Sequence, residues 1–319
     1  MIFILRRERH AFRSLHVDSF AHTLNMNLTA LPSLHPVKRA LIPVGGRGTR
    51  MYPATAAVPK ELLPIGNRPL LEFALDEIAD AGIAEVVLVT ARGKSAIEDF
   101  VEDWNDRHAG LLKVAYVRQR APRGLGDAVA CAEHVIGDAP FAVLLPDDLL
   151  VGPDSTLARL VRHQSATGAA AIALQPISDA ETSSYGVPEV SGSENGVHAI
   201  RRLVEKPGPA NAPSRLGVVG RYVLPGRVFR FLRNAKPGAK GEIQLTDAID
   251  ALARAEGAWG VPLSQRRIDC GSPEGYLEAQ LACSPVPDSH RPVALPRAAP
   301  SRRTASPAVV ALSPPDDCA

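Results

Sequence analysis

The sequence predicts a doubly wound α/β/α sandwich with a mixed, mainly parallel central sheet. Between residues 40 and 174, short apolar runs of strand length alternate with amphipathic segments of helix length. The first apolar run leads directly into Gly45 and Gly46, as a buried strand that feeds a loop does. Strands that alternate with helices pair in parallel and are covered by helices on both faces.

Each element of this alternation is recognisable in the residues. Pro69 opens one helical pattern and Gly82 follows its end, which is where proline and glycine are favoured. The expected strands are residues 40–44, 85–90, 112–117, 141–145 and 170–174, and the expected helices are 70–78, 95–101, 128–134 and 156–163.

After residue 175 the pattern changes to pieces typical of strands. Residues 186–190, 197–204 and 216–223 predict an antiparallel or mixed extension that covers one end of the sheet. A helix at 245–255, a strand at 259–263, a strand-like piece at 266–268 and a last helix opening at Ser272-Pro273-Glu274 complete the series.

Composition excludes several classes of function. The 319 residues are 45% hydrophobic and 22% charged, with a net charge of +2, which is too balanced for a nucleic-acid footprint or a polybasic membrane patch. Apolar runs stay well short of the ~20 residues of a transmembrane helix. The four cysteines show no CxxC spacing, which favours a reduced, cytoplasmic setting.

The two ends of the chain differ from the middle. Residues 1–37 carry no periodic apolar pattern, and residues 284–319 are dominated by Pro, Ala, Ser and Arg. We expect a disordered N-terminal extension at 1–37, a single domain at 38–283 and a disordered tail at 284–319.

The loop after the first strand carries the first chemical signal. Gly45, Gly46 and Gly48 allow backbone amides to approach a ligand, although a glycine-rich turn alone fits a plain βα loop equally well. Arg50 and Lys60 add two cations to the same loop, which suits a triphosphate better than a neutral ligand.

The continuation of this loop resembles a known family. Residues 46–55 (GRGTRMYPAT) and 59–64 (PKELLP) are similar to the signature of bacterial UTP–glucose-1-phosphate uridylyltransferases. Further similar blocks follow in order over residues 39–283: VRQ at 117–119, GLG at 124–126, LPDD at 145–148, YG at 185–186, EKP at 205–207, GRY at 220–222, EIQLTD at 242–247 and DCG at 269–271.

The resemblance implies a Rossmann-like fold of the nucleotide-diphospho-sugar transferase type, and it implies transfer of a uridylyl group from UTP to glucose 1-phosphate with Mg²⁺ as cofactor. Asp147 follows the strand at 141–145, at the sheet edge where ligands bind, and a carboxylate there can hold Mg²⁺. Asp269 is the second metal carboxylate by resemblance alone. Asp148 is an alternative ligand, which we interpret instead as an acid of the loop that faces away.

The remaining site residues divide between the two substrates. By resemblance, Arg50 and Lys60 hold the nucleotide phosphates, while Gly186, Glu205 and Lys206 bind the sugar phosphate. By the same resemblance, the residues that contact the base are Gly45, Gly46, Gln119 and Gly124. Gln119 can both donate and accept hydrogen bonds at the edge of uracil. Glu242 fits a pocket acid and a residue of a helix N-terminus equally well.

Two rival functions and one assembly state stay open. The same chemistry with another nucleotide or sugar 1-phosphate, such as glucose-1-phosphate thymidylyltransferase, is the nearest alternative, and a non-catalytic nucleotide-sugar-binding regulatory subunit is the other. The resemblance implies a homo-oligomer, a dimer or tetramer. The segment between the helix at 95–101 and the strand at 112–117 is shorter than the family's assembly arm, so the size of the oligomer is not fixed by it.

Overall fold

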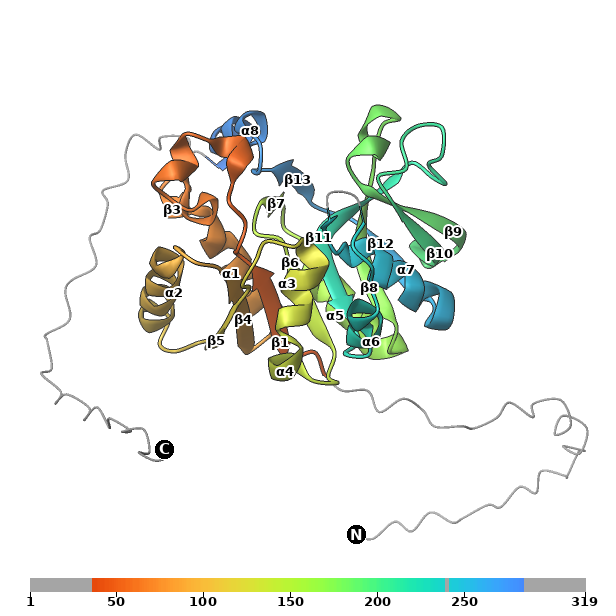
Figure 1. The fold of residues 1–319 in the computed structure, drawn as a ribbon, viewed down its shortest axis with the longest axis horizontal. Helices are drawn as coiled ribbons and strands as arrows, with labels where there is room; N and C mark the ends of the chain where they lie inside the picture. The colour runs from red at the N-terminus through yellow and green to blue at the C-terminus, as the bar shows by residue number, and fades with distance from the viewer. Residues whose placement is uncertain (1–35, 239–240, 284–319) are drawn as a thin grey trace, which may run out of the picture. The chain divides into compact units, whose positions relative to one another are not determined.

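The computed structural model describes residues 36–238 and 241–283, and the expectations for 1–35 and 284–319 lie outside this part of the chain. The central sheet has nine strands in the order β5-β4-β1-β6-β11-β8-β12-β10-β9 (Figure 1). Its strands are β1 (Arg39–Pro43), β4 (Glu85–Thr90), β5 (Lys113–Arg118), β6 (Phe141–Leu144), β8 (Ala170–Pro176), β9 (Gly186–Glu194), β10 (Val197–Glu205), β11 (Leu216–Leu224) and β12 (Ala258–Pro262).

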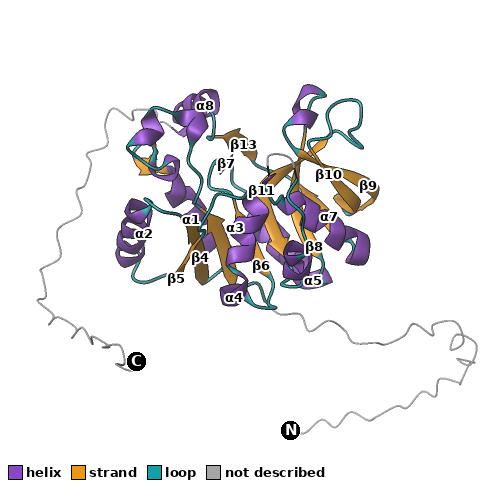
Figure 2. Ribbon diagram, viewed as in Figure 1, coloured by secondary structure: helices purple, strands orange, loops and turns teal. Residues whose placement is uncertain are grey.

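Helices cover both faces of this sheet (Figure 2). On one face pack α1 (Leu70–Asp80), α2 (Ser95–Arg107) and α5 (Thr156–Thr167), and on the other pack α3 (Leu125–Cys131), α4 (Glu133–Ile136), α6 (Val228–Arg233) and α7 (Leu245–Glu256). Successive residues of one strand serve opposite faces, since Leu41 packs in one core and Ala40 and Ile42 in the other. The expected α/β/α sandwich is confirmed.

All strands of the large sheet run the same way except β10 and β11. The pairs β1–β4, β1–β6, β4–β5 and β8–β12 are parallel, whereas β11 is antiparallel to both β6 and β8. The expectation that residues 216–223 belong to an extension at one end is therefore wrong. Leu216–Leu224 is a central strand: Val219 and Val223 pack in one core and Val218 and Leu224 in the other, as in a strand covered on both faces.

Smaller elements join the sheet to the loops above it. The strands β7 (Asp148–Val151) and β13 (Arg266–Asp269) pair antiparallel, β2 (Pro64–Ile65) pairs with β3 (Arg68–Pro69), and α8 (Pro273–Cys283) packs beside β13. The single helix expected at 128–134 is wrong, because α3 ends at Cys131 and α4 begins at Glu133. None of the helices in the described ranges has the length and apolar character needed to cross a membrane.

Candidate active site

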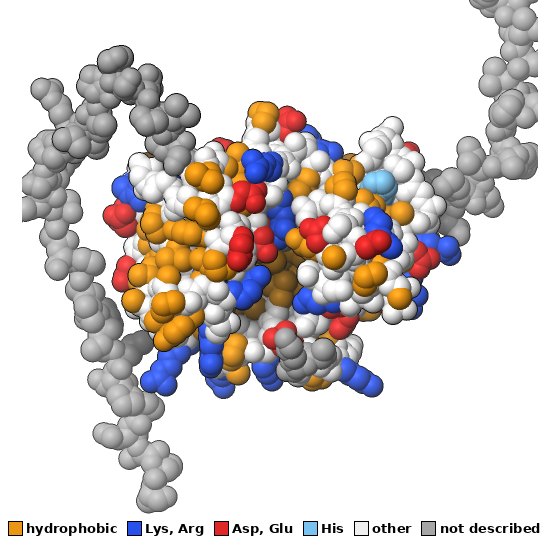
Figure 3. Space-filling model, turned by 90° about the horizontal axis from the view of Figure 1, so that it is seen from above, with side chains coloured by type: hydrophobic (Ala, Val, Ile, Leu, Met, Phe, Trp, Pro, Cys, Tyr) orange, Lys and Arg blue, Asp and Glu red, His pale blue; other side chains and the backbone are white. Residues whose placement is uncertain are grey.

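Two adjoining pockets open at the carboxyl ends of β1, β5 and β6. The glycine-loop pocket, of about 550 Å³, is lined by Gly45, Gly46, Lys60, Gln119 and Gly124 among others. The Lys206 pocket, of about 720 Å³, is lined by Tyr185, Gly186, Glu205, Lys206, Arg267 and Asp269 among others. Leu145, Asp147 and Glu242 line both pockets. Seen from above, this face is hollowed between two raised parts, and acidic and basic side chains gather along the hollow (Figure 3).

The loop that follows β1 winds through three short 3-10 helices, η1 (Thr49–Met51), η2 (Ala54–Ala56) and η3 (Lys60–Leu62). Gly48 has a φ of 64°, and a Cβ at this position would stand 3.0 Å from the Thr55 methyl group. Thr55 donates its hydroxyl hydrogen to the Gly48 carbonyl at 2.8 Å. Glycine at 48 therefore permits both the left-handed backbone and the close return of the loop, which brings Lys60 back over the pocket.

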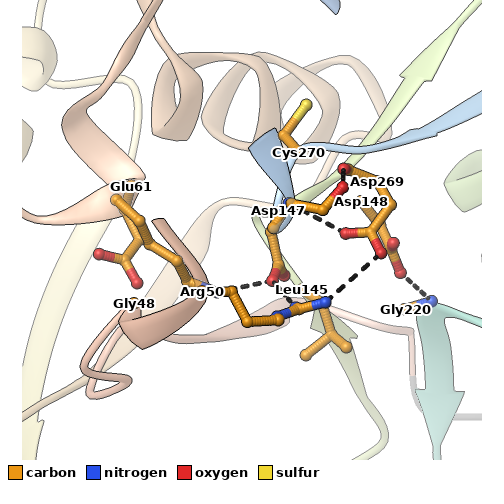
Figure 4. Close-up of polar contacts among 12 residues, drawn as sticks. Gly48, Arg50, Glu61, Leu145, Asp147, Asp148, Gly220, Asp269 and Cys270 are labelled. Carbon is orange, nitrogen blue, oxygen red and sulfur yellow. Dashed lines mark hydrogen bonds and ion pairs between the residues drawn. The ribbon is translucent and has the colours of Figure 1, made fainter. Parts of the chain in front are cut away.

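Asp147 lies at the centre of a cluster of charges (Figure 4). The Lys60 ammonium lies 2.6 Å from Asp147 Oδ2. Arg50 reaches between two carboxylates, with Nη2 3.9 Å from Asp147 Oδ2 and Nη1 3.8 Å from Asp269 Oδ2. Asp147 and Asp269 lie far apart in the sequence, and they meet because Cys270 N–H donates to the Asp147 carbonyl at 2.8 Å, next to the β7–β13 pair.

Gly271 allows the two aspartates to approach each other. A Cβ built at Gly271 would stand 2.5 Å from Arg50 Nη2, and 2.9 Å from both Asp147 Oδ2 and Asp269 Oδ1. The two carboxylates and the Arg50 guanidinium between them therefore converge beside Gly271, where any larger side chain would collide with them. As expected, the carboxylates of Asp147 and Asp269 lie close together although the two residues are far apart in the sequence.

The charges in this cluster reinforce one another. Burial alone would raise the pKa of Asp147, but Lys60 and then Arg50 outweigh burial, so the pKa of Asp147 lies below its usual value. Burial likewise would lower the pKa of Lys60, and the Asp147 carboxylate outweighs it, so the pKa of Lys60 is raised. Asp147 is therefore an anion and Lys60 a cation at neutral pH.

Asp148 differs from the interpretation as a loop acid that faces away. Its side chain is buried in β7, where Oδ2 accepts a hydrogen bond from Gly220 N–H at 2.7 Å (Figure 4). Oδ1 accepts from Arg267 Nε at 2.7 Å. That interpretation was wrong, because the cation that compensates Asp148 lies 119 residues further along the chain. Both of its oxygens have protein partners, so Asp148 is a structural anchor of the pocket.

We predict that Asp148→Ala destabilises the protein strongly, because it leaves the Arg267 guanidinium buried without its carboxylate. Removing one partner of a buried ion pair costs about 3–5 kcal/mol in the free energy of unfolding. Urea unfolding followed by circular dichroism measures this cost, and Asp154→Ala is the matched control because Asp154 is exposed. Equal losses in the two variants would contradict the structural role of Asp148.

The Lys206 pocket brings together its three expected residues. Glu205 ends β10 opposite Gly186 of β9, and the Lys206 ammonium lies 3.1 Å from Glu205 Oε1. Lys206 itself has a φ of 46°, and its N–H donates to the Tyr185 carbonyl at 3.1 Å. A Cβ at Gly186 would stand 3.5 Å from Glu205 Oε2. The turn after β10 therefore directs a half-exposed cation and a carboxylate to one wall.

The expected base-contact residues line the other pocket. Gln119 follows β5 and is buried, and its Oε1 is 3.2 Å from the place of a Cβ on Gly45. Gly124 has a φ of 98°, and a Cβ there would come within 2.6 Å of the Ile243 carbonyl oxygen. Glu242 stands next to this contact, two residues before the N-cap of α7 at Gln244, and it lines both pockets.

Sequence reasoning missed charged residues in both pockets, among them Arg267 and Glu61. Arg267 lines the Lys206 pocket and donates to the Tyr185 hydroxyl at 2.5 Å. Its spacing of two from Asp269 in a strand puts both side chains on one face, a signal that was present in the sequence. Glu61 lines the glycine-loop pocket while almost fully buried, and Lys94 compensates it at 2.9 Å. Nothing near Glu61 in the sequence indicates Lys94, because the pair joins two separate loops.

The chain matches a family model and curated proteins over most of its length. The nucleotidyl transferase family model matches residues 39–284. The UTP–glucose-1-phosphate uridylyltransferase YngB of Bacillus subtilis is 40% identical over 261 residues, which cover 76% of this chain and 88% of that protein. A UTP–glucose-1-phosphate uridylyltransferase of Pseudomonas aeruginosa is 37% identical, and the match covers 77% of this chain and 96% of that protein.

Solved structures resemble the fold as well. A UDP-glucose pyrophosphorylase crystallised with UDP-glucose superimposes with a TM-score of 0.72 and 37% identity, covering 77% of this chain and 98% of that one. The UTP-bound enzyme from Acinetobacter baumannii gives a TM-score of 0.68 at 36% identity, covering 77% of this chain and 93% of that one. The chain belongs to the nucleotidyl transferase family, and its similar relatives in that family are UTP–glucose-1-phosphate uridylyltransferases.

Proposed function

We propose that the protein transfers a uridylyl group from UTP to glucose 1-phosphate, which yields UDP-glucose and pyrophosphate. The observation that carries this proposal is the pair of adjoining pockets that share Asp147, with the cations Arg50 and Lys60 on one side and Lys206 on the other. The reaction requires two anionic substrates to be held side by side, so that a phosphate oxygen of one can reach the α-phosphorus of the other. The names of the relatives support the same substrates.

The proposed reaction is a single displacement at phosphorus. A phosphate oxygen of glucose 1-phosphate forms a bond to the α-phosphorus of UTP, and the bond from that phosphorus to the leaving pyrophosphate breaks. The attacking group is already an anion, so no general base is required. Repulsion between two anions is the main obstacle, and fixed cations around them reduce it while holding the reacting atoms in line.

Each substrate is assigned to one pocket. Uracil enters the glycine-loop pocket, where Gly45, Gly46 and Gly124 allow close backbone contact and Gln119 meets the base edge. Arg50 and Lys60 neutralise the triphosphate. In the other pocket, Lys206 binds the sugar phosphate, and Glu205, beside Gly186, accepts hydrogen bonds from sugar hydroxyls.

The residues at the junction of the pockets fit a magnesium ion. Mg²⁺ prefers one or two carboxylates together with phosphate oxygens and water. Asp147 and Asp269 supply two carboxylates that converge beside Gly271, where the half-exposed Arg50 guanidinium now lies between them. The described residues contain no group of three or more metal-binding side chains, so phosphate oxygens and water would complete the coordination. A bound Mg²⁺ neutralises phosphate charge during the displacement.

A pyrophosphate-release assay tests the proposal by combining each of UTP, dTTP, CTP and ATP with several sugar 1-phosphates. We expect the highest kcat/KM with UTP and glucose 1-phosphate. A higher value with dTTP would favour the thymidylyltransferase alternative, and the assay is needed because thymine and uracil present the same hydrogen-bonding edge. Tight binding of UDP-glucose with no release from any pair would favour the regulatory subunit.

We also predict that the two ends of the chain are dispensable for this activity. All the proposed site residues lie between Gly45 and Asp269. Val37 is buried in the core, so the N-terminal deletion stops at residue 35, and the division of the chain into an extension, a domain and a tail stays a proposal. A variant that lacks residues 1–35 and 285–319 is expected to retain kcat and melting temperature close to those of the full chain. A large loss of either on removal of the C-terminal segment alone would contradict this division.

Homo-oligomeric assembly remains a prediction of the resemblance. The helix α2 ends at Arg107, and β5 begins six residues later, so the arm associated with assembly in the family is short in this chain. Size-exclusion chromatography with light scattering measures the mass of the full chain, and a monomer would contradict the prediction of a dimer or tetramer.

A further inference from the structure

The side-chain amide of Gln119 is held from behind by acceptors. Nε2 donates to Asp127 Oδ2 at 2.7 Å and lies 3.3 Å from the Gly124 carbonyl oxygen. A carboxylate and a backbone carbonyl can accept hydrogen bonds but cannot donate them. Turning the amide over would therefore bring its oxygen against two other oxygens, so its orientation is fixed by the chemistry of these partners.

The other end of the amide faces the glycine-loop pocket. Oε1 stands 3.2 Å from the place of a Cβ on Gly45, which lines the same pocket. Within the described residues, Oε1 accepts no hydrogen bond from the protein. With both amide hydrogens directed at Asp127 and Gly124, Gln119 presents to a ligand only an acceptor.

Asp127 does not line the glycine-loop pocket. It lies buried in the first turn of α3 and opens on the far side to a separate hollow lined by Arg118, Arg120 and His134. Its second oxygen, Oδ1, accepts a hydrogen bond from Arg123 Nη2 at 2.8 Å. Any effect of Asp127 on a bound base must therefore act through Gln119.

We infer that Asp127 is a positioning residue for base selection, which holds Gln119 so that its oxygen meets a donor on the base. This inference rests on the proposed use of UTP. The N3 position of uracil is a donor, whereas N3 of cytosine is an acceptor and would oppose Oε1. Thymine has the same N3–H group as uracil, so this arrangement separates those two bases from cytosine and not from each other.

The test is the ratio of kcat/KM for UTP to that for CTP, measured with glucose 1-phosphate. In Asp127→Ala the amide is free to turn over and offer Nε2 to the base, so the ratio is expected to fall about tenfold or more, the effect of one mismatched polar contact. Asp127→Asn keeps an oxygen acceptor opposite Nε2 and is expected to restore most of the ratio. If the alanine variant fails to fold, Asp127→Leu fills the same space without an acceptor.

A purely structural role of Asp127 gives a different result. An acid in the first helical turn stabilises the helix, so its loss lowers the melting temperature whatever it does to Gln119. The matched control is Arg123→Ala, which removes the cation beside Asp127 but leaves the acceptor, and which is expected to leave the ratio unchanged. If Asp127→Ala or Asp127→Leu kept the UTP-to-CTP ratio of the parent protein, this inference would be overturned and the proposed function would stand. A parent protein without activity on UTP would instead overturn the proposed function.

Discussion

Asp269→Asn is expected to lower kcat by about 10²–10³, the range seen when one preorganised electrostatic contact is removed from an active site. The substitution keeps the size of the side chain and removes its charge. Asp269 is only partly buried, and the residues beside it fix its place: Gly271 N–H donates to Oδ1 at 2.9 Å. The loss of rate would therefore report the charge of the carboxylate rather than a change in the fold.

The dependence on Mg²⁺ identifies the cause of that loss. If Asp269 and Asp147 hold one ion, Asp269→Asn should raise the Mg²⁺ concentration needed for half-maximal rate, and Mn²⁺ titration followed by electron paramagnetic resonance should give weaker binding. Asp154→Asn is the matched control, since it removes one exposed carboxylate away from the pockets. Unchanged Mg²⁺ dependence in Asp269→Asn would remove Asp269 from the proposed metal site.

The local parts of the fold could be predicted from the sequence because burial leaves a direct pattern. Residues 85–90 form β4 as expected, since an apolar run bounded by polar residues has few alternatives in a buried sheet. The order of strands could not be predicted in the same way. Residues 216–224 read as a strand, but their periodicity carries no information on which neighbours they pair with, and β11 lies between two strands that precede it in the chain.

The site residues differ in the same way: those that share one loop could be predicted to lie together, and those brought together by distant strands could not. Gly45, Gly46 and Lys60 follow a strand and share a loop, so their neighbourhood is visible in the sequence itself. Asp147 and Asp269 are brought together by the β7–β13 pair, and no local pattern encodes that pairing. Asp148 shows the limit most directly, because whether an acid after a strand is exposed or buried depends on Arg267, which only the folded chain brings near.

Lys60→Ala and Lys206→Ala are expected to separate the two substrates. Lys60 lies in the glycine-loop pocket, so its loss should weaken equilibrium binding of UTP and also slow turnover. Lys206 lies in the other pocket, so its loss should weaken binding of the sugar phosphate and slow turnover, while UTP binding stays close to that of the parent. Each variant is expected to lose about 10²–10³ in kcat/KM, as for other single electrostatic contacts.

The two substitutions act on different local structures. The Lys60 ammonium lies 2.6 Å from Asp147 Oδ2, and its removal leaves Arg50, with Nη2 at 3.9 Å from the same oxygen, as the remaining cation beside Asp147. Lys60→Ala should therefore also raise the pKa of Asp147, because it removes the leading charge that lowers it. At Lys206 the backbone is left-handed, and alanine carries the same Cβ as lysine, so the cost of that conformation is retained in Lys206→Ala.

Isothermal titration with UTP, followed by steady-state kinetics with both substrates varied, distinguishes the assignments. Contacts that strengthen in the transition state lower kcat beyond their effect on binding, so Lys206→Ala should lower kcat as well as raise the KM for glucose 1-phosphate. Lys113→Ala is the control, because Lys113 is an exposed cation on the edge strand β5 and lines neither pocket. If Lys206→Ala abolished UTP binding while Lys60→Ala left it intact, the assignment would be wrong. UTP would then belong to the Lys206 pocket and glucose 1-phosphate to the glycine-loop pocket.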